Sequence, residues 1–476
     1  MAFRYQRLTR ALLDDIQKGR WQAGDMLPSV RQLMQRLQLS RATVLHALGE
    51  LEAQGWVEAQ PRRGYFVNPR PAKAPTATPS SLEAAPRLLS IDDVVHDVML
   101  KGAAFDLLPA ESRFDAKPPA IELLHRAISR AMRHTKGAQH QHYEDPAGLP
   151  ELRDTLAHRL RQQGCTSQAA DIVVTHGCQH ALLLALKSCT QPGDVVAVES
   201  PGYFGTLQLL QELGLKVLEL PCDPATGLNP ADVAKALTQW PITALVLTPS
   251  FATPTGALMP LEARHALAAL AKQHRLTLIE DHIYAELSFS SAPLPPMLAL
   301  APEHTLLCSS FSKSLSRDLR LGYVAGPAFT KRLAQLKQIT SLASNRLIEQ
   351  GLDEFIRRGD YDRHLRREQQ SLRVQRNALL DLLAQHFGDC HHRVPDGGLC
   401  LWLDLEPELD TLALYQRARQ EGIMITPGPM FTSQQGLYRH CLRLSFAHPW
   451  SGPRRQALAR LRVLVDGLKR GGKSEI

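Results

Sequence analysis

Residues 308–324 read CSSFSKSLSRDLRLGYV and place one lysine, Lys313, among serines. Two arginines, Arg317 and Arg320, follow it, and apolar strand-like runs flank the stretch on both sides. Like charges close together raise the free-energy cost of an ammonium ion, so we expect Lys313 to have the lowered pKa that a Schiff-base lysine needs. Hydroxyl and guanidinium groups are good donors to phosphate. The stretch therefore predicts an amine beside a phosphate site.

An amine beside a phosphate site indicates pyridoxal 5′-phosphate as the cofactor. Two alternatives stay open for this stretch. In the first, Lys313 is a solvated loop lysine. In the second, the residues from Ser310 to Lys313 form the S-x-x-K string of serine acyl-transfer enzymes. Those enzymes also carry S-D-N and K-T-G elements, and the chain contains neither string.

The length of the chain predicts more than one domain, and its positive charge is concentrated near the N-terminus. With 476 residues it is too long for one core, which predicts two or three domains. The contents of 44% apolar and 21% charged residues are those of a globular protein. The net charge is +8, and residues 1–70 hold 11 Lys plus Arg against 6 Asp plus Glu, which leaves 11 − 6 = +5. This local excess predicts a polyanion partner for the N-terminal part.

The cysteines and the apolar segments indicate a cytoplasmic protein. The 8 cysteines form no C-x-x-C pair and no metal-finger spacing, so we expect reduced thiols. Cys390, His391 and His392 are adjacent, and adjacent ligands rarely converge on one ion, so no metal site is predicted. The N-terminus has no signal-peptide core, and without a run of 18 apolar residues no membrane span is expected.

A linker separates two parts of the chain. The stretch at 69–86, PRPAKAPTATPSSLEAAP, is rich in Pro, Ala, Ser and Thr and lacks apolar periodicity. We expect a linker over residues 69–92, a head over residues 1–68 and a body over residues 93–470.

The head has the residue pattern of three helices followed by a hairpin. Apolar residues fall at helical spacing between Tyr5 and Ile16, and Gly19 ends that pattern. A second helix begins at Ser29. After a short turn, Ser40 caps a third helix.

Helix, tight turn and helix is the arrangement of helix-turn-helix proteins, whose second helix enters the major groove of DNA with its N-terminal residues at the base edges. Here those residues are Ser40, Arg41, Thr43 and His46. Residues 56–67 then form two short strands around a basic turn that is suited to phosphate or the minor groove. The candidate wing residues are Arg62, Arg63 and Gly64. A three-helix protein-interaction module is the alternative, but the wing and the local charge favour DNA.

Three segments of the head, GDMLPSVRQL, LSRATVLHAL and RRGYFV, together resemble the GntR-type winged helix-turn-helix. The match covers the whole head. It implies that double-stranded DNA is the partner and that Arg31 and Arg41 contact it.

The body alternates short apolar runs with helix-length spacers. The runs are DIVVTH, DVVAVES, ALVLTPS, LTLIEDHIY and TLLCSSFS. This alternation is typical of a mostly parallel sheet in an α/β domain. Because ligands bind at the carboxyl ends of such strands, the polar motifs that follow these runs are expected to form one site.

Three strand ends carry residues suited to a planar, phosphorylated ligand. Gly177 follows the first run and opens a helix whose backbone N–H groups are available to an anion. Tyr203 follows the second run and can lie flat on a ring, although a core tyrosine is the alternative. Asp281 ends LTLIE and needs a cationic partner, either a pyridinium nitrogen or a structural arginine.

The order and spacing of these polar residues resemble the fold-type I pyridoxal phosphate enzymes, the aspartate aminotransferase superfamily, over roughly residues 100–468. The resemblance implies a large domain with a mostly parallel sheet and a smaller α/β C-terminal domain. It assigns Lys313 to the Schiff base, Asp281 to the pyridine nitrogen and Tyr284 to the phenolic oxygen.

The same resemblance assigns the remaining parts of the site. Tyr203 stacks on the ring, and Gly177 opens the phosphate-binding helix. The phosphate is held by Cys178, Gln179, Ser310, Ser312 and Arg320. Tyr143 corresponds to the tyrosine that reaches the phosphate of a partner subunit, which implies a homodimer. Arg443, in LRLSF, corresponds to the arginine that grips a substrate α-carboxylate.

One position departs from the aminotransferase pattern. Aminotransferases usually carry Asn-Pro-x-Gly after the middle strand, with the Asn bonded to the ring oxygen, whereas this chain has Thr253 before Pro254. A hydroxyl on a shorter side chain replaces an amide there, which bears on transaminase efficiency.

A winged helix, a Pro-rich linker and an aminotransferase-like body together resemble the MocR subgroup of GntR regulators along the whole chain. The resemblance implies a DNA-binding transcriptional regulator that senses pyridoxal phosphate or an amine or amino-acid effector. The alternative is a pyridoxal phosphate-dependent aminotransferase, with or without a regulatory role. A scaffold that has lost the cofactor is disfavoured because the site residues are intact.

Overall fold

The computed structural model describes residues 4–17, 20–21, 24–53, 56–60, 64–67, 94–96, 98, 106–115, 118–134, 141–290, 293–388 and 390–471. The chain divides into two compact units, Met1–Leu88 and Leu89–Ile476. The division falls within residues 69–92, all of which lie outside the described residues. The linker and the domain bounds therefore stay predictions.

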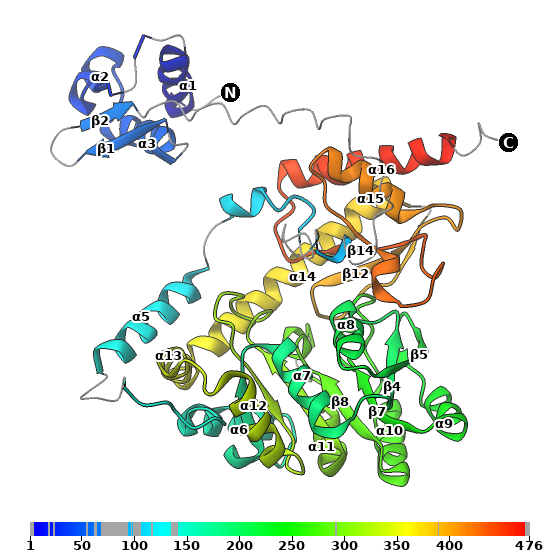
Figure 1. The fold of residues 1–476 in the computed structure, drawn as a ribbon. Coiled ribbons are helices and arrows are strands. Elements are labelled where there is room, and N and C mark those ends of the chain that lie inside the picture. Colours follow the sequence, from blue (N-terminus) through cyan, green and yellow to red (C-terminus); the bar gives the residue numbers. More distant parts are fainter. Residues whose placement is uncertain are drawn as a thin grey trace, which may run out of the picture. The chain divides into compact units, whose positions relative to one another are not determined.

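The first unit contains the expected three helices and hairpin (Figure 1). The elements are α1 (Arg4–Gln17), α2 (Val30–Leu37), α3 (Arg41–Ala53), β1 (Val57–Gln60) and β2 (Gly64–Val67). The strands pair antiparallel. Leu12 of α1, Leu33 of α2 and Leu48 of α3 are buried in one core, so the three helices pack as a single small domain.

Local capping sets the helix-turn-helix geometry. Ser29 and Gln32 form a capping box that starts α2. Gln38 ends α2 in the left-handed conformation, with φ 52° and ψ 44°, which turns the chain sharply. Ser40 Oγ then accepts a hydrogen bond from the backbone N–H of Thr43 at 3.2 Å, so the predicted cap of the third helix is confirmed.

The second unit is built on an eight-stranded sheet in the order β3-β10-β9-β8-β7-β4-β5-β6. The strands are β3 (Ile172–Thr175), β4 (Val195–Ser200), β5 (Lys216–Asp223), β6 (Gly227–Leu228), β7 (Ile242–Leu247), β8 (Thr277–Asp281), β9 (Thr305–Ser310) and β10 (Gly322–Ala325). The pairs among β9, β8, β7, β4 and β5 are parallel, while β10 and β6 pair antiparallel. The prediction of a mostly parallel sheet is confirmed.

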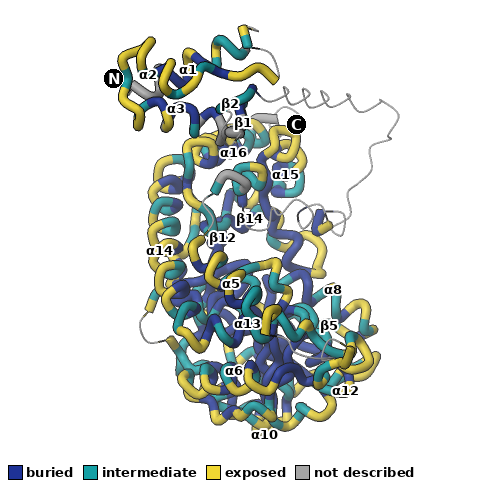
Figure 2. Tube along the Cα trace, turned by 90° about the vertical axis from the view of Figure 1, so that its left-hand side faces the viewer, coloured by how far each residue is buried: buried dark blue, intermediate teal, exposed yellow. Residues whose placement is uncertain are grey.

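Helices cover both faces of this sheet, as a sheet of continuous apolar strands requires. On one face lie α7 (Cys178–Cys189), α8 (Phe204–Glu212) and α12 (Thr330–Ser341). On the other lie α9 (Pro230–Gln239), α10 (Leu261–His274) and α11 (Met297–Leu300). Figure 2 shows the buried strands between the exposed outer helices.

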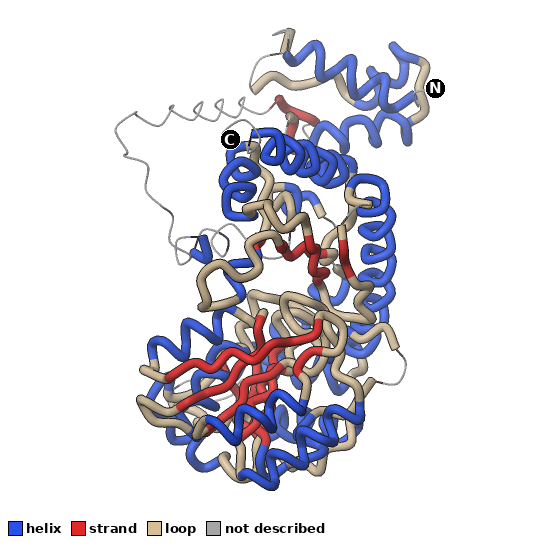
Figure 3. Tube along the Cα trace, turned by 90° about the vertical axis from the view of Figure 1, so that its right-hand side faces the viewer, coloured by secondary structure: helices blue, strands red, loops and turns tan. Residues whose placement is uncertain are grey.

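A second sheet forms a smaller domain at the C-terminal end (Figure 3). Its antiparallel order is β11-β12-β14-β13. The strands are β11 (His391–His392), β12 (Cys400–Asp404), β13 (Thr426–Pro427) and β14 (Cys441–Ser445). The long helix α14 (Asp360–His386) leads into it, and α15 (Thr411–Gln420) and α16 (Gly452–Gly471) pack on it.

The remaining helices surround the large domain. They are α5 (Pro119–His134), α6 (Pro150–Gln162) and α13 (Arg346–Arg357). Short 3-10 turns also occur along the body: η1 (Glu111–Phe114), η3 (Ala169–Asp171), η4 (Ala285–Leu287), η5 (Pro302–His304) and η6 (Gly428–Phe431). No helix within the described part of the chain is long and apolar enough to cross a membrane.

The segment around 106–115 is tied to the small domain by a buried ion-pair network. Arg454 of α16 donates to both carboxylate oxygens of Asp106, at 3.0 and 2.8 Å, and to both of Asp115, each at 3.0 Å. Residues 106–115 are therefore held against α16.

Helices α5 and α13 approach each other closely at Gly351. A Cβ at this position would lie 2.5 Å from Ile128 Cγ1 and 2.8 Å from Ile128 Cα, so a side chain needs the helices to separate. We expect Gly351→Ala to lower the free energy of unfolding by about 1–3 kcal/mol, as overpacking does.

The matched control is Gly467→Ala in α16, where the nearest atom to an added Cβ is Arg417 Nη1 at 4.0 Å. Both substitutions gain the same helix propensity, so the difference between their free energies of unfolding reports the steric clash at Gly351. Urea midpoints measured on both variants check this, and equal midpoints would contradict the packing described here.

Candidate functional site

The site residues stand at one edge of the large sheet because their strands end there. The pairing makes β3 run in the same direction as β9, β8, β7 and β4. Their carboxyl ends therefore share an edge. Gly177 follows β3, Tyr203 follows β4, Thr253 follows β7, and Asp281 and Ser310 end β8 and β9. The predicted convergence of the strand ends is confirmed.

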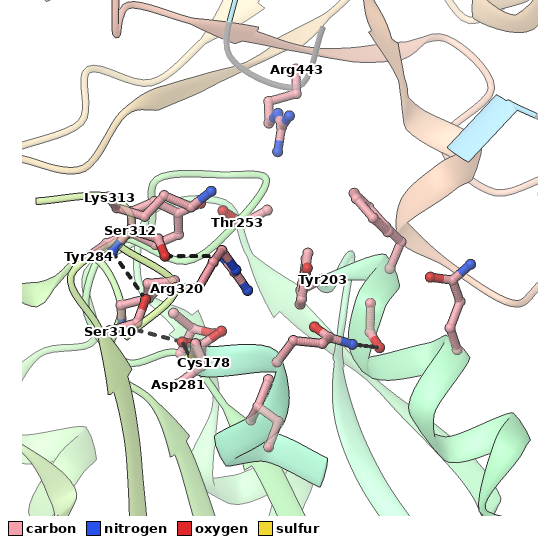
Figure 4. A pocket seen from close by; sticks show the side chains of 17 residues that line it. Cys178, Tyr203, Thr253, Asp281, Tyr284, Ser310, Ser312, Lys313, Arg320 and Arg443 are labelled. Carbon is pink, nitrogen blue, oxygen red and sulfur yellow. Dashed lines mark hydrogen bonds between the residues drawn. The ribbon is translucent and has the colours of Figure 1, made fainter. Parts of the chain in front are cut away.

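A cavity of about 410 Å³ lies at this edge. Most of the residues singled out from the sequence line it: Cys178, Gln179, Tyr203, Thr253, Asp281, Tyr284, Ser310, Ser312, Lys313, Arg320 and Arg443 (Figure 4). Two others do not line it. Gly177 contributes the start of α7 beneath it, and Tyr143 is 82% exposed to solvent.

Six further residues of the cavity wall were not predicted from the sequence: Leu182, Phe204, Gly205, Gln208, Thr248 and Ile283. The signal was present for some of them. Phe204 and Gly205 directly follow Tyr203, and Gln208 stands one helical turn beyond Phe204 on α8. Thr248 directly follows the last residue of β7.

Lys313 has an environment that disfavours its charged form. Burial, followed by the positive charges of Arg317 and Arg443, lowers the pKa of the Lys313 ammonium to about 7, against an opposing effect of Asp281. The sequence attributed this shift to Arg317 and Arg320. The largest cause is burial, Arg317 comes next as predicted, and Arg443 follows because the small domain brings its guanidinium to the cavity from far along the chain.

Asp281 is a carboxyl group shielded from water beneath the cavity. Burial raises its pKa, although Cys178 Sγ donates to its Oδ1 at 3.3 Å and the backbone N–H of Ile283 donates at 3.2 Å. A cation beside it would offset the cost of keeping the carboxylate charged.

An anion-binding corner lies at the start of α7. Gly177 is the N-cap, with φ 84°, and Arg320 donates through Nη2 to the carbonyl of His176 at 3.3 Å and through Nη1 to Ser312 Oγ at 3.4 Å. A Cβ at Gly177 would lie 2.9 Å from Arg320 Nη2, so only glycine leaves the guanidinium its place. The helix N-terminus, the hydroxyls and the guanidinium together suit a phosphate.

Arg443 reaches the cavity from β14 of the small domain (Figure 4). It is buried, its guanidinium lies 5.4 Å from the centre of the Phe431 ring, and Nη2 donates to Thr426 Oγ1 at 3.4 Å. The cavity is therefore formed by both domains of the body.

In the first unit, the candidate DNA-binding residues gather at the helix-turn-helix. Arg31 in the first turn of α2, Ser40 and Arg41 are exposed. Thr43 is half-buried, and its Oγ1 shares a hydrogen bond of 2.8 Å with Ser40 Oγ. Gly64 begins β2 with φ 118°. The side chain of His46, together with Arg62 and Arg63, lies outside the described residues.

Comparisons with known proteins agree with both units. Residues 4–67 match bacterial regulatory proteins of the gntR family, and residues 111–461 match aminotransferase class I and II. The HTH-type transcriptional regulator YjiR of Escherichia coli, described as uncharacterized, is 34% identical over 96% of this chain and 98% of its own length. The chain belongs to the MocR subgroup of GntR-type transcriptional regulators.

Two further similar proteins are a transcriptional regulator and an aminotransferase of known structure. The HTH-type pyridoxine biosynthesis transcriptional regulator PdxR of Corynebacterium glutamicum is 30% identical over 83% of this chain and 81% of its own. The crystal structure of LysN, an α-aminoadipate aminotransferase from Thermus thermophilus complexed with N-(5′-phosphopyridoxyl)-L-leucine, superposes with a TM-score of 0.68 and 29% identity, over 73% of this chain and 89% of that chain. This MocR protein is accordingly a DNA-binding regulator with a pyridoxal 5′-phosphate cofactor.

The residues of the cavity fit that cofactor. Ser312 and Arg320 of the phosphate corner line the same cavity as Lys313, and the buried carboxyl of Asp281 is suited to a pyridinium nitrogen.

The lowered pKa of Lys313 predicts the pH dependence of cofactor uptake. Only the neutral amine attacks an aldehyde, so the uptake rate should rise with pH through a midpoint of about 7 and level off above it. Arg317→Met removes one nearby positive charge, which raises the pKa of Lys313 and moves the midpoint to higher pH. Stopped-flow absorbance of the cofactor-free protein measures both.

Lys272→Met serves as the control, because Lys272 is an exposed cation on α10 that takes no part in the shift at Lys313. A midpoint near 10 in the wild type, or a shift in the control equal to that in Arg317→Met, would refute this electrostatic account.

The geometry of α3 predicts how Arg41 acts on DNA. Arg41→Ala should weaken operator binding by about 1–3 kcal/mol and reduce the preference over a scrambled duplex, since the residue stands at the start of the recognition helix. Arg20→Ala is the control, because Arg20 is exposed, pairs with Asp15 at 2.9 Å and lies after α1. Fluorescence anisotropy on both duplexes checks this. Equal losses in the two variants would contradict the assignment of α3.

Proposed function

We propose that this regulator holds pyridoxal phosphate covalently through Lys313 and senses an amino-acid-like effector at the same cavity. The observation that carries the proposal is the position of one amine, one buried carboxyl, one phosphate corner and one guanidinium around a single cavity. A sensor of amino acids needs a group that reacts with the amine and a group that binds the carboxylate. The cofactor aldehyde held at Lys313 would supply the first, and Arg443, from the other domain, the second.

Each remaining side chain has a role in this proposal. Asp281 pairs with the pyridine nitrogen, Tyr284 donates to the phenolic oxygen, and Tyr203 stacks on the ring. The phosphate is held at Gly177, Cys178, Gln179, Ser310, Ser312 and Arg320. The cofactor, when bound, supplies an aldehyde carbon that condenses with primary amines.

Thr253 stands where an aminotransferase usually has asparagine, and it lines the cavity together with Tyr284. Its hydroxyl offers one hydrogen where an amide offers two. This difference favours a sensor that binds its effector over an enzyme that turns it over quickly.

A homodimer is part of the proposal. Large apolar side chains are exposed on the body, among them Met132 of α5 at 59% and Ile339 of α12 at 77%. Tyr143 is 82% exposed and does not line the cavity of its own chain, as expected for a tyrosine that reaches a partner subunit. A two-fold dimer also suits a palindromic operator. Chromosomal DNA as the partner places this activity in the cytoplasm.

The second candidate function is aminotransferase activity. Lys313, Tyr284 and Arg443 all line the cavity, which is the set that an aminotransferase uses. Release of keto acid separates the two functions: a sensor forms no more than one equivalent per cofactor, whereas an enzyme forms many when a second keto acid is supplied.

The effector proposal predicts a carboxylate preference that depends on Arg443. An amino acid that binds the wild type should bind about 10–100 times more tightly than the amine lacking its carboxylate, which is the range of a charge-assisted hydrogen bond. Arg443→Leu should remove this preference while leaving the affinity for the amine nearly unchanged. Titrations followed by cofactor absorbance measure all four affinities. A preference that survives in Arg443→Leu would rule out Arg443 as the carboxylate group.

A further inference from the structure

A cluster of potential metal ligands lies in the small domain, outside the cofactor cavity. Asp404 ends β12, Cys441 begins β14, and His440 precedes it. The ligand atoms of these three side chains all lie within 4.8 Å of one another. Asp404 and Cys441 are direct partners in the antiparallel pairing of β12 with β14, so their side chains lie on the same face of the sheet.

The distances from Asp404 Oδ1 to the other two ligand atoms are within about 0.4 Å of those in a tetrahedral zinc site. His440 Nε2 lies 3.0 Å from Asp404 Oδ1, and Cys441 Sγ lies 3.7 Å from the same oxygen. Zinc bond lengths of about 2.0–2.3 Å place tetrahedral ligands about 3.4 Å apart for nitrogen and oxygen and about 3.6 Å apart for sulfur and oxygen. An ion fits among the three groups with small side-chain adjustments.

Burial and access also suit a bound ion. Cys441 is buried, which protects a metal-bound sulfur, whereas the side chains of Asp404 and His440 are 45% and 33% exposed, which leaves a route for the ion. Across β12, His391 of β11 is the strand partner of Asp404 and stands on the same face. It is not one of the three clustered groups, so the fourth position is open to water.

We propose that Asp404, His440 and Cys441 form a binding site for Zn²⁺ or a similar divalent transition metal. The donor set of one carboxylate, one imidazole and one thiolate is of the type that zinc takes in proteins. The ion would fasten the end of β12 to the start of β14. Arg443 stands two residues after Cys441 on that strand, so the metal would fix the strand end that carries this residue of the cavity wall.

Co²⁺ is the probe of choice, because a thiolate ligand gives it a sulfur-to-metal charge-transfer band and tetrahedral geometry gives it visible d–d bands. The full chain with its cofactor is stripped of metal and titrated with Co²⁺. We expect one equivalent to bind with both signatures and Zn²⁺ to displace it, in keeping with the affinity order of these ions. Binding without the charge-transfer band, or failure of Zn²⁺ to displace Co²⁺, would overturn the proposal.

Two variants and one control assign the ligands. Cys441→Ser should abolish the charge-transfer band, and Asp404→Asn should weaken Co²⁺ binding by more than about tenfold, the loss that even an outer partner of such a site causes. Cys390→Ser is the control, because this half-buried thiol directly precedes β11 and is not in the cluster. Asp404→Asn alters a partly exposed side chain and keeps the test open if Cys441→Ser does not fold. A band that persists in Cys441→Ser, or an unchanged affinity in Asp404→Asn, would refute the site.

Discussion

The site of this protein is organised around a lysine amine that is shielded from water and lies near guanidinium groups. Both features raise the free energy of the ammonium form, so the amine loses its proton near neutral pH. The pKa of Lys313 falls to about 7, so a large fraction of the amine is neutral and able to react. Burial also disfavours the charged form of Asp281 and raises its pKa, so a nearby cation would stabilise the carboxylate. One ligand with an aldehyde, a pyridinium nitrogen and a phosphate satisfies both groups and the corner at Gly177.

The position of Arg443 explains how such a site can serve regulation. It comes from β14 of the small domain, whereas the lysine, the carboxyl and the phosphate corner belong to the large sheet. A ligand that contacts both domains therefore favours one arrangement of the two domains over others. To change operator occupancy tenfold, the effector must favour one arrangement by about 1.4 kcal/mol. One charge-assisted hydrogen bond is enough for a bias of that size.

The sequence was sufficient for the features that depend on local patterns. The apolar runs predicted the strands, and Ser40 predicted the start of α3, because these signals act within a few residues. The contribution of Arg443 to the pKa of Lys313 was out of reach, since it depends on how the two domains meet. The side chains Gln208 and Thr248 were missed because neither carries a recognisable motif. The cluster of Asp404, His440 and Cys441 was missed for a related reason. Its members are distant in sequence and are brought together by the pairing of β12 with β14, whereas the spacing of potential ligands along the sequence indicated only the adjacent Cys390, His391 and His392.

The most direct test of the sensor account is the operator affinity of the cofactor-loaded protein, measured with increasing concentrations of an amino acid that binds the cavity. The account predicts a shift of at least about tenfold in the wild type and no shift in Lys313→Ala. It also predicts a wild-type response in Lys337→Met, which removes a buried lysine that has a lowered pKa but does not line the cavity. A response in Lys313→Ala equal to that of the wild type, or an operator affinity that no cavity-binding amino acid changes in the wild type, would contradict it.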